Sequence, residues 1–171
     1  ITLELEKQAT FASSFTPGFS MAVPKFNPKK ISPDDLCGHT VAVQTGTAQE
    51  TAAQHKSKQC VKAGRKPIDL LSYASQSDAT TNVTGGKADV LYADSVITGY
   101  AIKQTSKLEA LGGITDAAKF GVVTAKNDGG LSKAIQVATQ KLIDDGTMKK
   151  LLAAWGTQDG LIKTSQVNPK S

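Results

Sequence analysis

Short apolar segments alternate with helix-forming segments through the middle of the chain, and this alternation limits the folds that it can adopt. Residues 41–43 form an apolar run with two valines, and nearly all residues from Ala48 to Gln59 favour helix. The pattern then repeats. Strands that alternate with helices at this spacing predict right-handed βαβ units and a parallel sheet. The later members of the series are predicted strands at residues 66–73 and 88–92 and predicted helices at residues 77–83 and 96–102.

The first predicted strand meets its helix at residues 44–47, QTGT, so this turn lies at a helix N-terminus. There the N–H groups of Thr47, Ala48 and Gln49 have no partner within the helix, and the helix dipole adds partial positive charge. Gly46 permits a close backbone approach, and the two threonine hydroxyls are further donors. Such a site suits a small anion, most simply a carboxylate. A threonine here also caps a helix without binding any ligand, so the turn alone leaves both interpretations open.

A carboxylate follows the third predicted strand, at Asp94. In a parallel sheet the carboxyl ends of the strands share one edge, and ligands bind beyond that edge. Asp94 and the turn at residues 44–47 should therefore lie together. They are complementary to an amino acid zwitterion, whose carboxylate would lie at residues 45–48 and whose ammonium group would lie at Asp94. Asp94 is also suited to capping the next helix, and the two roles are compatible.

The two cysteines, Cys37 and Cys60, flank the first strand and helix of this series. A helix that runs back along its strand brings those two ends to the same edge, where a disulfide can form. Closing this loop would stabilise the fold by about 3 kcal/mol in the chain-entropy model, and it implies an oxidising compartment. The alternative is two unrelated thiols in a cytosolic protein. A metal site would need more ligands than the cysteines and nearby His39 supply.

The two ends of the chain carry helical patterns. Residues 1–15 have apolar side chains at helical spacing and no proline or glycine, which predicts a helix. Two apolar stripes near the C-terminus predict two more helices, from Leu131 to Leu142 and from Met148 to Trp155, and we expect Trp155 in the core. Further strands are predicted at residues 19–23, 108–111 (at a sheet edge) and 120–124, and residues 157–171 are expected to be irregular.

Composition and charge exclude several classes of protein. With 171 residues, 39% apolar and 20% charged, the chain suits one globular domain or two small ones. Its net charge of +5 is spread along the chain without a basic block that aromatic residues interrupt, so nucleic acid is not an expected partner. No run approaches the roughly 18 apolar residues of a membrane span. The first residues lack the features of a signal peptide, so any export signal must lie upstream.

From Leu3 to about Leu161 the chain resembles the extracellular solute-binding proteins of polar amino acid ABC importers. The resemblance rests on four stretches in this order: LELEKQATFASSF, GFSMAVPKFNPKKISPDDLCGHTVAVQTGTAQE, GGKADVLYADS and FGVVTAKNDGGLSKAIQVATQKLIDDGTMKKLLAAWG. It implies an α/β fold of the two-lobed type II periplasmic-binding class, with a mainly parallel sheet flanked by helices. It also implies that residues 1–18 contain the last helix of lobe 1, that residues 19–124 form lobe 2 with the hinge strands, and that residues 125–171 are C-terminal helices and tail of lobe 1.

The resemblance also implies roles for individual residues. In that family the QTGT turn binds the carboxylate of the amino acid, the Asp94 position binds its amino group, and the Gln44 position often contacts its side chain. The implied ligand-binding residues are Gln44, Thr45, Gly46, Thr47, Ala48 and Asp94. Ala48 departs from the pattern, because many relatives have a hydroxyl residue there and this chain offers only a backbone N–H. Most of lobe 1 is absent by the same comparison, including an arginine that clamps the carboxylate.

The implied function is the amino acid-binding component of an ABC importer, which captures a zwitterion between two lobes, has no enzymatic activity and needs no cofactor or metal. Its partners would be the amino acid and a membrane permease, and its location would be extracytoplasmic, in the periplasm or anchored as a lipoprotein. The alternatives are a sensor domain and a dehydratase-like enzyme. An enzyme would need an acid or base, for which His39, His55, Glu50 and Asp94 are the candidates. If lobe 1 is absent, the apolar stripes of the last two helices lack a partner, so we also expect self-association, for example by exchange of those helices.

Overall fold

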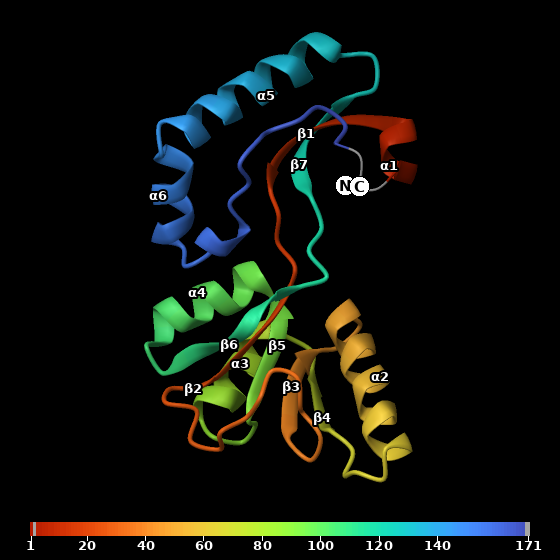
Figure 1. Cartoon of the computed structure of the whole chain (residues 1–171), viewed down its shortest axis with the longest axis vertical. Coiled ribbons are helices and arrows are strands. Elements are labelled where there is room, and N and C mark those ends of the chain that lie inside the picture. Colours follow the sequence, from red (N-terminus) through yellow and green to blue (C-terminus); the bar gives the residue numbers. More distant parts are fainter. Residues whose placement is uncertain (2, 170–171) are drawn as a thin grey trace. The chain divides into compact units, whose positions relative to one another are not determined.

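The computed structural model describes residues 1 and 3–169, which divide into two compact units (Figure 1). Unit 1 comprises residues 1–18 and 116–171, and unit 2 comprises residues 19–115. Among the described residues, no helix is both long and apolar enough to cross a membrane. The assignment of chain segments to two lobes, made from the resemblance, stays a prediction.

Unit 2 is built on a five-stranded sheet with the strand order β4-β3-β5-β2-β6. Its strands are β2 (Phe19–Pro24), β3 (Thr40–Gln44), β4 (Asp69–Tyr73), β5 (Val90–Asp94) and β6 (Leu108–Thr115). As predicted, β3 pairs in parallel with β4 and with β5. The sheet is nevertheless mixed, because β2 is antiparallel to both of its neighbours, β5 and β6. The predicted edge position is confirmed for β6.

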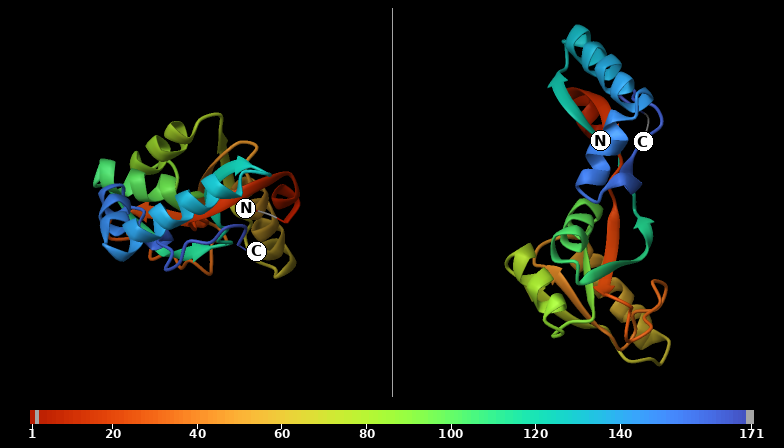
Figure 2. Two further views of the ribbon diagram at one scale, coloured as in Figure 1. Left: turned by 90° about the horizontal axis from the view of Figure 1, so that it is seen from above. Right: turned by 90° about the vertical axis from the view of Figure 1, so that its left-hand side faces the viewer.

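Three helices pack on this sheet: α2 (Ala48–Lys62), α3 (Gln76–Thr84) and α4 (Ser95–Thr105) (Figure 2). The sequence specifies where they begin and end. The side chains of Thr47 and Ser75 accept hydrogen bonds from the first turns of α2 and α3, and α3 ends at Gly85. All three helices were predicted at these places.

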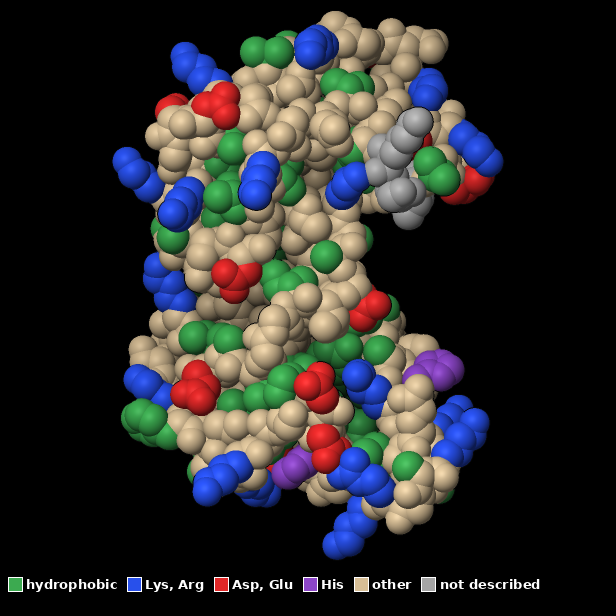
Figure 3. All heavy atoms as spheres, in the orientation of Figure 1, with side chains coloured by type: hydrophobic (Ala, Val, Ile, Leu, Met, Phe, Trp, Pro, Cys, Tyr) green, Lys and Arg blue, Asp and Glu red, His purple; other side chains and the backbone are tan. Residues whose placement is uncertain are grey.

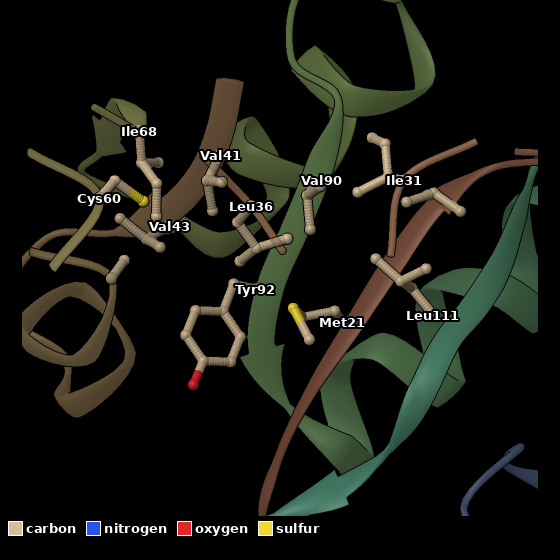
Figure 4. Packing of buried hydrophobic residues seen from close by; sticks show 12 residues of the cluster. Met21, Ile31, Leu36, Val41, Val43, Cys60, Ile68, Val90, Tyr92 and Leu111 are labelled. Carbon is tan, nitrogen blue, oxygen red and sulfur yellow. The ribbon is translucent and has the colours of Figure 1, made fainter. Parts of the chain in front are cut away.

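The core of unit 2 lies on both faces of the sheet. Successive side chains of a strand point to opposite faces, so Val41 and Val43 join one buried cluster and Ala42 joins the other. Figure 4 shows the first cluster. This cluster includes Ala53 of α2, and the second includes residues of α3 and α4. Burial on both faces explains why the predicted strands at residues 41–43 and 88–92 show no alternation with polar residues.

A disulfide joins Cys37 and Cys60, which confirms the predicted pairing. Cys37 precedes β3 and Cys60 lies in the last turn of α2, with 5.6 Å between their Cα atoms. Cys60 is buried in the first cluster of the core. The bond therefore fixes the strand and helix that meet at the QTGT turn.

In its described residues, unit 1 contains a two-stranded antiparallel sheet, three helices and a 3-10 turn. These elements are α1 (Leu3–Gln8), β1 (Ala9–Phe15), β7 (Phe120–Ala125), α5 (Gly129–Asp144), α6 (Thr147–Ala154) and η1 (Gln158–Gly160). The C-terminal segment is largely irregular, as predicted, but it is tied to β1. The hydroxyl of Ser165 donates to the carbonyl of Ser13 at 2.6 Å, and Ala12 forms an isolated bridge with Val167.

Two predictions for unit 1 are wrong. Only Leu3–Gln8 is helical at the N-terminus, because residues 9–15 form β1, whose backbone pairs with β7 and whose Ala12 and Ser13 are buried. The helical spacing of the two phenylalanines in this segment was therefore misleading. Trp155 was expected in the core but is 60% exposed, because it lies at the end of α6, a helix with no buried residue.

Candidate binding site for a small zwitterion

The QTGT turn connects β3 to α2 at the carboxyl edge of the unit 2 sheet. The N–H of Thr45 still donates to the carbonyl of Tyr73, at 2.8 Å, so the pairing with β4 continues past the end of β3. The backbone then reverses at Gly46, whose φ of +77° is strained for any residue with a side chain. This turn aims the N-terminus of α2 toward the sheet edge.

Thr47 is the N-cap of α2. Its hydroxyl oxygen accepts a hydrogen bond from the N–H of Glu50 at 3.2 Å and donates to the carbonyl of Gln44 at 2.7 Å. The predicted capping role of Thr47 is therefore confirmed. Its hydroxyl hydrogen is engaged within the turn, which leaves backbone N–H groups as the main donors for a ligand.

The side chain of Glu50 also holds the turn in place. Its carboxylate accepts hydrogen bonds from the N–H of Gly46 at 2.7 Å and from the hydroxyl of Ser72 at 2.5 Å. These bonds, the one from Ser72 above all, hold the pKa of the Glu50 carboxyl below its usual value. Threonine at the cap and glutamate three residues later form a variant of the capping box.

Three N–H groups at this helix end remain for a ligand. Within the described residues, the backbone N–H groups of Thr47, Ala48 and Gln49 have no hydrogen-bond partner. They point from the first turn of a helix, where the dipole favours an anion. Ala48 contributes only this backbone group, as the sequence implied.

Asp94 lies at the carboxyl end of β5 and is the N-cap of α4, but its side chain makes no capping hydrogen bond. Instead, its Oδ1 accepts a hydrogen bond from Nε2 of Gln49, at 2.9 Å. Gln49 is 5% exposed, whereas Asp94 is exposed to solvent. The carboxylate of Asp94 therefore lies beside the first turn of α2, as predicted for two segments that follow parallel strands.

The sequence did not predict a role for the side chain of Gln49. Its backbone N–H was included among the donors, but nothing in its pattern indicated that its amide would reach Asp94 across the sheet edge. Gln44 has a different contact, because its Nε2 donates to the carbonyl of Ala74 at 3.3 Å. Its side chain therefore lies over the neighbouring loop between β4 and α3.

The histidines lie away from this site. His39 precedes β3 at the opposite edge of the sheet, where its Nδ1 is 3.6 Å from Oδ2 of Asp89. His55 is exposed on α2. Among the described residues, no cluster of three His, Cys, Asp or Glu side chains could hold a metal ion. The titratable side chains described for this site are consequently Asp94 and Glu50, and its donors are backbone N–H groups.

Comparison with known proteins identifies relatives with a common role. No family model matches the chain. The arginine-binding protein of Corynebacterium glutamicum is 36% identical over 140 residues, which are 81% of this chain and 46% of that protein. The histidine-binding periplasmic protein of Escherichia coli is 31% identical over 127 residues, 69% of this chain and 46% of that protein. The chain thus spans about half the length of these curated relatives.

Solved structures agree with the sequence relatives. An ancestral cationic amino acid solute-binding protein is 26% identical and superposes with a TM-score of 0.77, over 91% of this chain and 66% of that one. A substrate-binding protein of a polar amino acid ABC uptake transporter from Streptococcus thermophilus, 20% identical, shares the fold with a TM-score of 0.74, over 95% of this chain and 62% of that one. Over most of its own length the chain is therefore similar to the substrate-binding proteins of amino acid ABC transporters.

Proposed function

We propose that the carboxyl edge of unit 2 binds a free amino acid as a zwitterion. One observation carries this proposal: the hydrogen bond of 2.9 Å between Gln49 and Asp94, which holds a carboxylate beside the N-terminus of α2. The α-carboxylate of the ligand would accept hydrogen bonds from the N–H groups of Thr47, Ala48 and Gln49 at that terminus. Its ammonium group would bind Asp94, whose Oδ2 is not engaged by Gln49.

Thr45, Gly46 and Gln44 have supporting roles in this proposal. Gly46 gives the turn its shape, Thr45 presents an exposed side chain beside the bound carboxylate, and Gln44 lies where a ligand side chain would extend. Thr45, Ala48 and Asp94 are exposed to solvent, and a typical hydrogen bond has a net contribution of only about 1 kcal/mol. We therefore expect this chain to bind amino acids in the millimolar range.

A cationic amino acid is the ligand class that we infer for this site. The relatives are named for arginine and histidine, and a structural relative is described as a binder of cationic amino acids. The charges of this edge support the same choice. Acidic residues Glu50, Asp78 and Asp94 lie in its turns and first helical turns, and the sequence places no lysine or arginine at residues 44–50, 73–78 or 92–98.

In the cell the protein would deliver this amino acid to the permease of an ABC importer from an extracytoplasmic position, in the periplasm or as a lipoprotein. The names of the relatives and the disulfide support that location. Self-association through the exposed apolar side chains of α5 and α6 also stays a prediction. Light scattering across a range of concentrations tests it, and a strictly monomeric species would contradict it.

The binding proposal is tested by NMR titration of this chain with arginine. The amide signals of Thr47, Ala48 and Gln49 and the carboxyl signal of Asp94 should shift together and saturate at millimolar concentrations. Agmatine, which lacks the carboxylate, should leave the amide signals unchanged. Replacing Asp94 with Asn should abolish the response, because the ammonium group loses its charged partner.

The matched control is Asp69→Asn, which removes one exposed carboxylate at the start of β4, on the other edge of the sheet. It should bind as the parent chain does. Equal binding by the Asp94 and Asp69 variants would refute the assignment of the ammonium site. A response to agmatine equal to that for arginine would refute the carboxylate site.

We also propose that the chain binds its ligand without chemical turnover. The relatives named above are binding proteins, although one structural neighbour is described as a precursor of cyclohexadienyl dehydratase. A dehydratase needs a proton donor at the substrate, and both histidines lie away from the proposed site. Incubation with a cyclohexadienyl substrate tests this point, since appearance of an aromatic product would establish an enzyme.

A further inference from the structure

The edge of unit 2 opposite the candidate site is strongly basic. Six exposed lysines lie in the loops at the amino ends of β3, β4, β5 and β6 and at the carboxyl end of the antiparallel strand β2. Figure 3 shows lysine and arginine side chains along this lower edge of unit 2. We call these lysines, together with Phe26, the basic edge: Lys25, Lys29, Lys30, Lys66, Lys87 and Lys107.

The loop that follows β2 is held in place by several hydrogen bonds. The N–H of Phe26 donates to the carboxylate of Glu109 at 2.8 Å. The amide of Asn27 both donates to and accepts from the backbone of Ile31, at 2.8 and 2.9 Å. Lys29 forms an ion pair of 2.7 Å with Asp89, which is almost buried. Hydrogen bonds within the loop, together with the contacts to Glu109 and Asp89 outside it, therefore fix the conformation of residues 24–31.

This loop also stores backbone strain. Phe26, Asn27 and Lys30 all have positive φ angles, of 68°, 40° and 50°. Such angles are unfavourable for residues other than glycine, and an aromatic residue gains nothing from them locally. Strain of this kind persists where the surroundings impose it, and it is concentrated at functional positions.

The strained loop exposes an aromatic ring among cations. Phe26 is 85% exposed, more than any other large apolar side chain that the structure describes. The ammonium group of Lys25 lies 5.8 Å from its ring centre. The backbone of Lys25 is bonded to that of Lys107, and the backbone of Lys30 to that of Asn27, so the backbones of Lys107 and Lys30 are tied to the loop that carries the ring. Among the carboxylates of this edge, Asp89 and Glu109 are engaged with Lys29 and with the Phe26 backbone, whereas Asp69 at the start of β4 is exposed.

We propose that the basic edge docks on the surface of a membrane that contains anionic phospholipids. Phe26 would enter the interface between headgroups and acyl chains, while the lysines contact lipid phosphates. A single projecting ring is too small for a stable protein interface, which buries about 800 Å² on each partner, whereas a bilayer accepts one apolar anchor beside several cations. Because the ligand site lies at the other edge of the sheet, docking would leave it accessible.

Vesicle sedimentation tests this proposal with the chain as it is. The chain should sediment with vesicles of phosphatidylglycerol and phosphatidylcholine in equal parts, and should remain in solution with phosphatidylcholine alone. High salt should release it, since salt screens exposed charges. The triple variant Lys25→Gln, Lys30→Gln, Lys107→Gln should lower the partition coefficient about fivefold for each lysine removed.

The matched control removes the same charge elsewhere in the chain, with Lys56→Gln and Lys58→Gln on α2 and Lys133→Gln on α5. It should retain most of the binding. Equal losses in the two triple variants would overturn the proposal, because net charge alone would then explain the attraction.

The aromatic anchor is tested separately with Phe26→Asn, since asparagine tolerates the positive φ of this position. This variant should unfold at the same temperature as the parent and bind the mixed vesicles several-fold more weakly, whereas Phe26→Trp should bind more strongly. Binding that is unaffected by Phe26→Asn, or that free polyphosphate matches, would refute a membrane surface and indicate a polyanion in solution.

Discussion

The two units of this chain bury different kinds of side chain. Every buried apolar residue that the structure describes lies in unit 2, except Ala12 and the prolines Pro17 and Pro169. Unit 1 buries mainly hydroxyl side chains: Thr10, Ser13, Thr124, Ser132, Thr139, Thr157 and Ser165. Its large apolar side chains are mostly exposed, among them Val123 at 60% and Leu151 at 52%. The strands and helices of the two units look equally regular, but only one unit has a hydrophobic core.

This difference shows that regular secondary structure and stability are separate properties. Burial of apolar surface is the main favourable term in folding, and unit 2 has it on both faces of its sheet. Unit 1 relies on the β1–β7 pairing and on hydrogen bonds of its C-terminal segment. We therefore expect unit 2 to unfold cooperatively and unit 1 to open at lower free energy.

A core substitution in unit 2 should have the largest effect. Leu91 is fully buried in β5, between the sheet and the helices α3 and α4. Leu91→Ala should lower the free energy of unfolding by about 2 to 5 kcal/mol, because it removes buried methyl groups and leaves a cavity. Urea denaturation followed by circular dichroism measures this loss.

The same substitution in unit 1 provides the comparison. Leu151 is half exposed on α6, so Leu151→Ala should change the free energy of unfolding by no more than about 0.5 kcal/mol. Similar losses for the two variants would contradict the conclusion that the apolar core is confined to unit 2.

The disulfide should have the next largest effect. Its cysteines are 23 residues apart and enclose β3 and most of α2. The bond therefore lowers the conformational entropy of unit 2 in the unfolded state. Replacing both cysteines with serine should cost about 3 kcal/mol in the chain-entropy model. Thermal unfolding of the parent chain with and without reductant should show the same shift, and thiol titration of the native chain should find no reactive thiol. Two reactive thiols would contradict the pairing.

The sequence predicts the structure of unit 2 better than that of unit 1. In unit 2 the strands, helices and disulfide were predicted from local patterns, because apolar runs such as residues 41–43 and 88–92 coincide with buried strands. The adjacency of Asp94 and the QTGT turn was also predicted, since both follow parallel strands. The contact of Gln49 was not, because a side chain that reaches between two elements leaves no periodic signal.

In unit 1 the same reasoning failed for residues 9–15. The two phenylalanines four residues apart suggested a helix, but the segment is a strand because its backbone pairs with β7, more than a hundred residues away along the chain. Trp155 was placed in the core as the last member of an apolar stripe at helical spacing, but it is exposed. Both errors lie in a unit without a dense apolar core. There the spacing of apolar residues is a poorer guide to secondary structure and burial.

A buried hydroxyl of unit 1 should contribute less than the core of unit 2. Ser165 is 2% exposed, and its hydroxyl donates to the carbonyl of Ser13 on β1. Ser165→Ala leaves that carbonyl without this donor and should cost about 1 to 2 kcal/mol. The exposed neighbour Thr164 is the control, and Thr164→Ala should be neutral. Fluorescence of Trp155, the single tryptophan of the chain, follows the unfolding of unit 1.

The smallest effects on stability should appear at acidic pH. They arise from two carboxyl groups, one in each unit. Hydrogen bonds from Ser72 and Gly46 lower the pKa of Glu50 at the start of α2 in unit 2. Hydrogen bonds from Thr147 lower the pKa of Asp145 at the start of α6 in unit 1. Each group binds protons more weakly in the folded chain. Its stabilising contribution is therefore present above the ordinary pKa and is lost as the pH falls through the lowered one.

Glu50→Gln and Asp145→Asn should therefore flatten the acid limb of stability, each in its own unit. If the units open separately, Asp145→Asn changes the acid transition that Trp155 fluorescence reports, and Glu50→Gln leaves that transition unchanged. Amide hydrogen exchange of β3 and β5 should show the reverse, with only Glu50→Gln altering the loss of protection below about pH 4.5, the ordinary pKa of a glutamate. Both exposed carboxylates contribute little, so the informative result is which probe responds. A response of both probes to both variants would mean that the two units unfold as one, and that the hydroxyl-lined interior of unit 1 is as cooperative as the apolar core of unit 2.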